Sequence, residues 1–190
     1  MTLANQLTMA RLAMALATCA ALMVRAPALH IAALLLFVLA MITDWVDGYV
    51  ARKTGSVSPF GKVADPIADK ILVLGAMIGL SRAHVGVPLW AVFLIMAREL
   101  VMGGVRVLTV SQQGKILAAE RWGKISMVFQ SSSVLGMIAV LVAREQAPQY
   151  LPGALDRLPY ALSLACVVSA WGSMYMYLRQ SRQLLEKSWG

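Results

Sequence analysis

Charged side chains are scarce in this sequence, and acidic ones are the scarcest, with nine Asp and Glu residues against seventeen Lys and Arg residues. Charged residues make up 14% of the chain, whereas a soluble domain carries roughly 25%. Hydrophobic residues make up 59%, and the mean hydropathy is +0.71. A soluble fold of 190 residues has no interior that would hold so many apolar side chains. The composition therefore predicts an integral membrane protein.

Cysteine is also rare, and the two that occur, Cys19 and Cys166, lie inside apolar runs without a C-x-x-C partner. This placement predicts small buried side chains and no disulfide framework. Aromatic residues do not alternate with basic ones, so the net charge of +8 does not indicate a nucleic-acid-binding protein. No basic segment precedes the first apolar run, since Arg11 comes too late, and we expect no cleaved signal peptide.

Six apolar runs are long enough to cross a membrane as helices, and clusters of Gly and Pro separate them. The expected helices cover residues 8–25, 28–52, 65–82, 87–110, 121–143 and 158–178. The sequence shows no repeat and no change of composition along the chain. We therefore expect an all-α integral membrane protein with six transmembrane helices in a single domain, residues 1–190.

Basic residues near the predicted helix ends are distributed unequally, nine on one side of the membrane against four on the other. Loops rich in Lys and Arg stay in the cytoplasm. This asymmetry predicts a multi-pass protein of the inner cell membrane with both termini in the cytoplasm. The connection between the second and third helices then lies on the cytoplasmic side as well.

That connection and its flanks, "DWVDGYVARKTGSVSPFGKVADPIADK", hold four of the nine acidic residues. Asp44 and Asp47 are three apart, and Asp65 and Asp69 are four apart, so each pair shares a helix face. A short connection makes the two helices antiparallel, which places the pairs opposite each other. Four partly desolvated carboxylates need compensating charge. Oxygen ligands without His or Cys suit two Mg²⁺ or Mn²⁺ ions, as in two-metal sites for phosphoryl chemistry.

Two other interpretations of the aspartates are open. They could be solvated residues at helix ends, paired with nearby basic side chains: Arg52, Lys53, Lys62 and Lys70. They could also belong to a divalent-cation transporter, because intramembrane carboxylates can mark an ion path. A transport path needs polar residues through the whole bilayer, however, and these carboxylates gather at one face. Gly48 and Ala51 would leave open space in which a nucleotide could lie.

The spacing of eight residues resembles the signature of the CDP-alcohol phosphotransferases. It reads Asp44-x-x-Asp47-Gly48-x-x-Ala51-Arg52, then eight residues, then Gly61-x-x-x-Asp65-x-x-x-Asp69. The resemblance implies a six-helix membrane enzyme, usually a homodimer, in which an alcohol attacks a CDP-linked donor and CMP leaves. It assigns metal binding to Asp44, Asp47, Asp65 and Asp69, and makes Asp69 the general base. The same resemblance places the CDP donor against Asp44, Asp47, Gly48, Ala51, Arg52, Gly61 and Asp65.

Stretches within and outside the signature resemble the bacterial members that use CDP-diacylglycerol and glycerol 3-phosphate as substrates. They are "NQLTMARL", "TDWVDG", "DPIADK", "AREL" and "WGK". For the acceptor's phosphate we predict a basic and polar set: Arg106, Lys124, Arg98 and Thr8. Alternatively, Arg98 and Glu99 form a buried structural pair. Since sequence neighbours point to different helix faces, we do not expect these two to bond to each other directly.

Ser126 and Met127 depart from this pattern, because those members usually have Lys and Thr there. One cation fewer in a phosphate pocket leaves other acceptors open: phosphatidylglycerol, as in cardiolipin synthases, serine or inositol phosphate. The "RE" at Arg98 and Glu99 favours glycerol 3-phosphate, since the cardiolipin synthases usually lack it.

Overall fold

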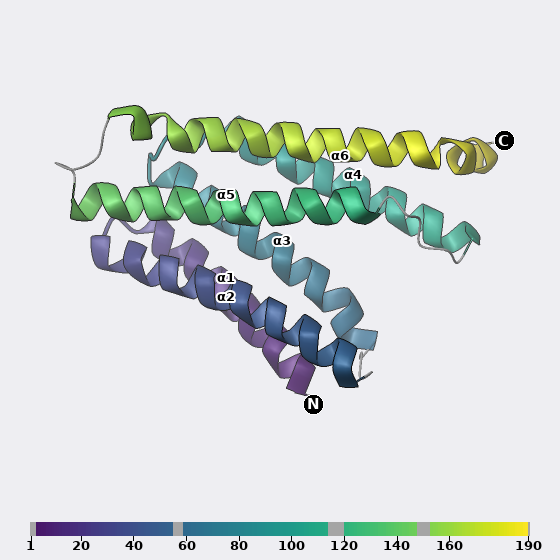
Figure 1. The fold of residues 1–190 in the computed structure, drawn as a ribbon, viewed down its shortest axis with the longest axis horizontal. Helices are drawn as coiled ribbons and strands as arrows, with labels where there is room; N and C mark the ends of the chain where they lie inside the picture. Colours follow the sequence, from purple (N-terminus) through teal and green to yellow (C-terminus); the bar gives the residue numbers. More distant parts are fainter. Residues whose placement is uncertain (1–2, 55–58, 114–119, 148–152, 190) are drawn as a thin grey trace. The chain divides into compact units, whose positions relative to one another are not determined.

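The computed structural model describes residues 3–54, 59–113, 120–147 and 153–189, and these ranges contain helices and no strand (Figure 1). The helices are α1 (Leu3–Met23), α2 (Pro27–Thr54), α3 (Pro59–Arg82), α4 (Leu89–Gln113), α5 (Glu120–Gln146) and α6 (Leu158–Trp189), with a short 3₁₀ helix, η2 (Gly153–Asp156), before α6. Within these ranges, the side chains of residues 3–5, 47–54, 59–63, 65, 106–113, 120–121, 154 and 180–189 lie outside the description.

All six predicted helices are present, and α3 and α6 extend furthest beyond their predicted bounds. Helix α3 begins at Pro59, so Asp65 and Asp69 lie inside the helix rather than at its start. Helix α6 continues to Trp189 rather than ending near residue 178. Its last part is rich in Leu, Arg, Gln, Glu and Lys, which favour helix even where the chain is no longer apolar.

Four helices contain a stretch long and apolar enough to cross a membrane, in the part of the chain that the structure describes. These stretches are Gln6–Met23, Pro27–Val46, Trp122–Gln146 and Leu158–Arg179. Helices α3 and α4 carry charged residues in their described parts, Asp69 and Lys70 in α3 and Arg98 and Glu99 in α4. The part of the chain that the structure describes is therefore all-helical, with four candidate membrane spans.

The helices form two compact units, which are described separately. Unit 1 comprises Met1–Val87 and Val134–Pro159, and unit 2 comprises Pro88–Ser133 and Tyr160–Gly190. In unit 1, α1 packs against both α2 and α3. The three helices run alternately up and down, so the start of α1, the end of α2 and the start of α3 lie at one end of unit 1 (Figure 1).

Glycine allows α1 and α3 to approach closely. Gly75 and Gly79 are four apart on α3, and a Cβ atom at Gly79 would lie 2.5 Å from the Cβ atom of Leu22. A Cβ atom at Gly75 would lie 3.4 Å from that of Cys19. Small residues four apart are a common way for membrane helices to pack, because dispersion contacts replace the hydrophobic effect there. Gly79 in particular tolerates no side chain without a shift of α1.

At the opposite end of unit 1, polar contacts join α2, α5 and η2. Nδ1 of the buried His30 lies 2.7 Å from Oε1 of Glu145, and Nη2 of Arg144 donates to the carbonyl oxygen of Leu155 at 3.0 Å. Arg144 also pairs with Asp156 at 3.2 Å. These contacts close the end of unit 1 that is farther from the signature aspartates.

Unit 2 holds α4, the first part of α5 and α6. Apolar contacts join α4 to α6, with Met102 and Tyr177 buried against Val105 and Met174. Hydroxyl contacts join α5 to α6, since Oγ of Ser126 lies 3.3 Å from Oγ of Ser169. Gln130 donates to the same Ser126 hydroxyl at 3.0 Å. The Ser126 hydroxyl therefore serves the packing of α5 against α6.

Candidate active site

Helix α1 contributes a buried cation to the end of unit 1 where the aspartates lie. The side chain of Arg11 is 0% exposed, and Thr8, three residues earlier, is buried too. Residues three apart share a helix face. A guanidinium group without water around it is stable only beside acceptors and negative charge. The partners of Arg11 therefore show where negative charge gathers.

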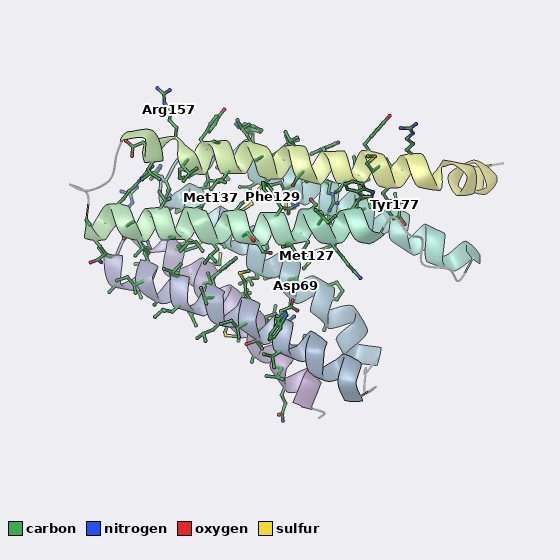
Figure 2. The ribbon with its side chains drawn as sticks, in the orientation of Figure 1. Asp69, Met127, Phe129, Met137, Arg157 and Tyr177 are labelled. Atoms are coloured by element: carbon green, nitrogen blue, oxygen red, sulfur yellow. The ribbon has the colours of Figure 1, made fainter. Side chains whose placement is uncertain are left out.

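One nitrogen of Arg11 contacts aspartates from two different helices. Nη1 lies 2.7 Å from Oδ1 of Asp44 on α2 and 3.3 Å from Oδ1 of Asp69 on α3. Figure 2 labels Asp69 on α3. The structure thus brings together one aspartate from each predicted pair. The Asp69 side chain is 15% exposed and that of Asp44 is 48% exposed. Solvent therefore reaches this pair of carboxylates mainly at Asp44.

Six signature residues lie on helical backbone but outside the described side chains: Asp47, Gly48, Ala51, Arg52, Gly61 and Asp65. Their predicted metal and donor contacts remain predictions. Among the side chains that are described, no group of three or more His, Cys, Asp or Glu residues could hold a metal ion. Asp44 and Asp69 are the two signature carboxylates whose positions can be compared.

In unit 2, Arg98 is buried and bonded on all sides of its guanidinium group. Its Nε donates to the carbonyl oxygen of Ala170 at 3.1 Å, and its Nη2 donates to Oγ of Ser173 at 2.5 Å. Both partners are on α6. Its Nη1 pairs with the carboxylate of Glu99, its neighbour in sequence.

The expectation that Arg98 and Glu99 would not bond to each other was wrong. Their Cβ atoms do point to different faces of α4, but both side chains are long, and their ends meet beside the helix. The contacts favour the structural alternative for this pair, in which Arg98 fastens α4 to α6. All three guanidinium nitrogens of Arg98 therefore have partners on α4 or α6.

The other residues predicted for the acceptor's phosphate differ in position. Lys124 is exposed near the start of α5, whereas Ser126, two residues later, is buried against α6. The position where the resembling sequences have a second Lys is therefore used here for packing. Arg106 lies on α4, and its side chain is outside the described ones. Thr8 is buried on α1, one turn before Arg11.

Comparison with known proteins matches residues 1–177 to the CDP-alcohol phosphatidyltransferases. The chain belongs to this family. A CDP-diacylglycerol–glycerol-3-phosphate 3-phosphatidyltransferase from Bacillus subtilis is 34% identical over 163 residues, which are 86% of this chain and 76% of that protein. The enzyme of the same name from Treponema pallidum is 34% identical over 165 residues, 84% of this chain and 74% of that protein. A cardiolipin synthase (CMP-forming) from Oryza sativa subsp. japonica is 29% identical over 163 residues, 80% of this chain and 49% of that protein.

Members of the CDP-alcohol phosphatidyltransferase family are generally dependent on divalent metal ions, and the described residues fit such an ion. Oδ1 atoms of Asp44 and Asp69 converge on one positively charged nitrogen, so the site between α2 and α3 already accommodates a cation. Both ligands are hard carboxylate oxygens, which Mg²⁺ and Mn²⁺ prefer. The open side of Asp44 would admit an ion from solvent.

Sequence reasoning about this phosphatidyltransferase missed the role of Arg11. The residue was recognised as part of "NQLTMARL", but no function was predicted for it. The available signal was a charged residue inside an apolar helix, three positions after a Thr. The pairing itself could not be predicted, because it depends on how close α1 comes to α2 and α3.

Proposed function

We propose that this protein transfers the phosphatidyl group of CDP-diacylglycerol to glycerol 3-phosphate, giving phosphatidylglycerophosphate and CMP. The observation that carries the proposal is the convergence of Asp44 and Asp69, from two helices, on one buried cation at positions of the family signature. The names of the Bacillus subtilis and Treponema pallidum relatives support this donor and this acceptor.

The reaction is a displacement at phosphorus. The acceptor's hydroxyl oxygen forms a bond to the phosphorus that carries diacylglycerol, the bond from that phosphorus to the oxygen of CMP breaks, and the hydroxyl proton goes to a base. Asp69 is the base in this proposal, as the family resemblance assigns, and its side chain is largely buried. A positioned carboxylate can take up the hydroxyl proton during attack. Two Mg²⁺ or Mn²⁺ ions, when bound, polarise the pyrophosphate and stabilise the charge of the departing CMP.

The signature residues divide into metal and donor ligands in this proposal. Asp44, Asp47, Asp65 and Asp69 hold the ions. Gly48, Ala51, Arg52 and Gly61 lie along the CDP group together with the first three aspartates. The acceptor's phosphate is bound by Arg106, Lys124 and Thr8, while Arg98 holds α4 to α6. Lys124 is exposed near the start of α5, where a cationic side chain can contact an anion.

The proposed topology follows from helix length and charge. Helix α3 has 24 residues and α4 has 25, so each is about 36 Å long, enough to cross a hydrocarbon core of about 30 Å. With these two, six helices cross the inner cell membrane as a single domain. Both termini and the aspartates then face the cytoplasm, where glycerol 3-phosphate is available. We also propose a homodimer, on the family resemblance alone.

The identity of the acceptor is tested by offering the protein several alcohols. Purified protein in detergent, with CDP-diacylglycerol and Mg²⁺, receives radiolabelled glycerol 3-phosphate, phosphatidylglycerol, serine and inositol phosphate in parallel reactions. We expect phosphatidylglycerophosphate as the main product. Cardiolipin as the main product would favour the second candidate, for which the rice relative and Ser126 are the supporting observations. Product with any other acceptor and none with glycerol 3-phosphate would overturn the proposal.

A further inference from the structure

We propose that Arg11 is a positioning residue that serves as an internal counter-ion, holding the aspartates of α2 and α3 together until divalent ions bind. The inference rests on the metal site of the proposed function. Its basis is one nitrogen, Nη1, that lies 2.7 Å from Asp44 and 3.3 Å from Asp69 on a side chain that is 0% exposed.

The burial of Arg11 distinguishes this role from binding of substrate. A side chain with no exposed surface offers no face to the pyrophosphate of a donor or the phosphate of an acceptor. It acts through the groups that it touches, and these include the carboxylates of Asp44 and Asp69. Arg11 therefore positions residues of the site rather than contacting the reacting atoms.

The charges explain why a counter-ion is needed. Without a cation, the carboxylates of Asp44 and Asp69 would repel each other, since both lie within 3.3 Å of the same Arg11 nitrogen. Asp69 is mostly out of water, so solvent screens that repulsion poorly. Arg11 places one positive charge between these two negative ones. The half-exposed Asp44 provides the open side for an incoming ion.

Divalent ions and the guanidinium group then take the same partners. Once an ion binds the carboxylates, it offsets their repulsion, and it also repels the positive charge of Arg11. The stabilisation that Arg11 gives to the folded protein should accordingly be largest without metal and smaller with metal. A residue that merely packs helices together would stabilise both forms equally.

The test is the melting temperature of purified full-length protein in detergent, measured in EDTA and again in saturating Mn²⁺. In EDTA we expect Arg11→Met to melt roughly 10 °C below wild type, since it removes the cation between Asp44 and the largely buried Asp69. In Mn²⁺ we expect this difference to shrink to less than half. By reciprocity, Arg11→Met should also bind Mn²⁺ more tightly, with a half-saturating concentration roughly fivefold lower in an electron paramagnetic resonance titration.

Two variants serve as controls. Arg25→Met makes the same chemical change at an exposed residue between α1 and α2, and it should show little difference in either condition. Arg11→Lys keeps the positive charge and should recover part of the stability lost in EDTA. A melting difference for Arg11→Met that is unchanged or larger in Mn²⁺ would overturn the proposal, as would unchanged or weaker Mn²⁺ binding.

A second variant covers the case in which Arg11→Met cannot be purified. Arg11→Met combined with Asp44→Asn removes one of the opposed carboxylates, so we expect it to fold in Mn²⁺ and to lose less stability in EDTA. If neither variant folds in Mn²⁺, Arg11 is needed for packing whatever the charge, and the proposal fails. Turnover of wild-type protein tests the proposed function separately, because the melting experiment contains no substrate.

Discussion

Arg11 in unit 1 and Arg98 in unit 2 are both buried, but their partners differ in charge. Arg98 meets one carboxylate and two neutral oxygens, so its own charge is balanced by Glu99. Arg11 meets two carboxylates, one from α2 and one from α3. An arginine paired with one carboxylate and two neutral oxygens fastens helices, whereas an arginine that bridges two carboxylates marks a place that can take a further cation. The comparison therefore assigns Arg98 a structural role and Arg11 a role at the site.

The largest effect is expected from Asp69→Asn, which keeps the shape of the side chain and removes its ability to take a proton. Loss of a general base typically costs 10²–10⁴-fold in rate, so we expect turnover to fall at least about a hundredfold with the fold retained. The measurement is turnover with CDP-diacylglycerol, glycerol 3-phosphate and Mg²⁺.

Asp156→Asn is the matched control for that change. Asp156 lies on η2 with its side chain 70% exposed, and its pair with Arg144 is at the far end of unit 1. We expect turnover near the wild-type value. If Asp69→Asn were equally active, the base assignment would be lost.

Arg98→Met should destabilise the protein strongly and to the same extent in EDTA and in Mn²⁺. The change breaks the ion pair with Glu99 and removes two bonds to α6, and breaking a buried pair costs about 3–5 kcal/mol. Ser173→Ala, which removes one of these bonds, should cost only about 1 kcal/mol. Thermal melting in both conditions measures this. If the loss of stability in Arg98→Met differed between EDTA and Mn²⁺, the two arginines would not have different roles.

Gly79→Ala tests whether the position of α1 matters for the site. The added methyl group would collide with Leu22, and overpacking of this kind costs roughly 1–3 kcal/mol. Because α1 carries Arg11, we expect turnover to fall along with the melting temperature. Gly104→Ala on α4 meets no atom within 4 Å, so it should be neutral or slightly stabilising. Equal behaviour of the two variants would show that close packing of α1 and α3 is not required.

The smallest effect is expected at Lys124. Lys124→Met should raise KM for glycerol 3-phosphate about tenfold, because one charge-assisted bond to the phosphate is lost. KM for CDP-diacylglycerol should be unchanged. Ser126→Ala, two residues away and turned toward α6, should leave both KM values unchanged. A higher KM for glycerol 3-phosphate in Ser126→Ala alone would move the acceptor site to the other face of α5.

Much of the fold could be predicted from the sequence, because apolar length and the Gly and Pro breakers determine where membrane helices begin and end. The convergence of Asp44 and Asp69 could be predicted as well, since their spacing and a short connection bring the two helices together. The partners of the buried arginines could not. Arg11 reaches Asp69 across 58 residues of chain, and Arg98 bonds to its neighbour and to α6. Such contacts depend on the distances between packed helices and on the lengths and rotamers of side chains, and the periodicity of the sequence does not predict these distances.

The release of CMP by wild-type protein, measured against phosphatidylglycerophosphate formed as Mn²⁺ is titrated from zero, tests the central claim most directly. The account predicts no turnover in EDTA and, with Mn²⁺, one CMP released for each phosphatidylglycerophosphate formed from CDP-diacylglycerol and glycerol 3-phosphate. Turnover without a divalent ion, or CMP released without the lipid product, would contradict it.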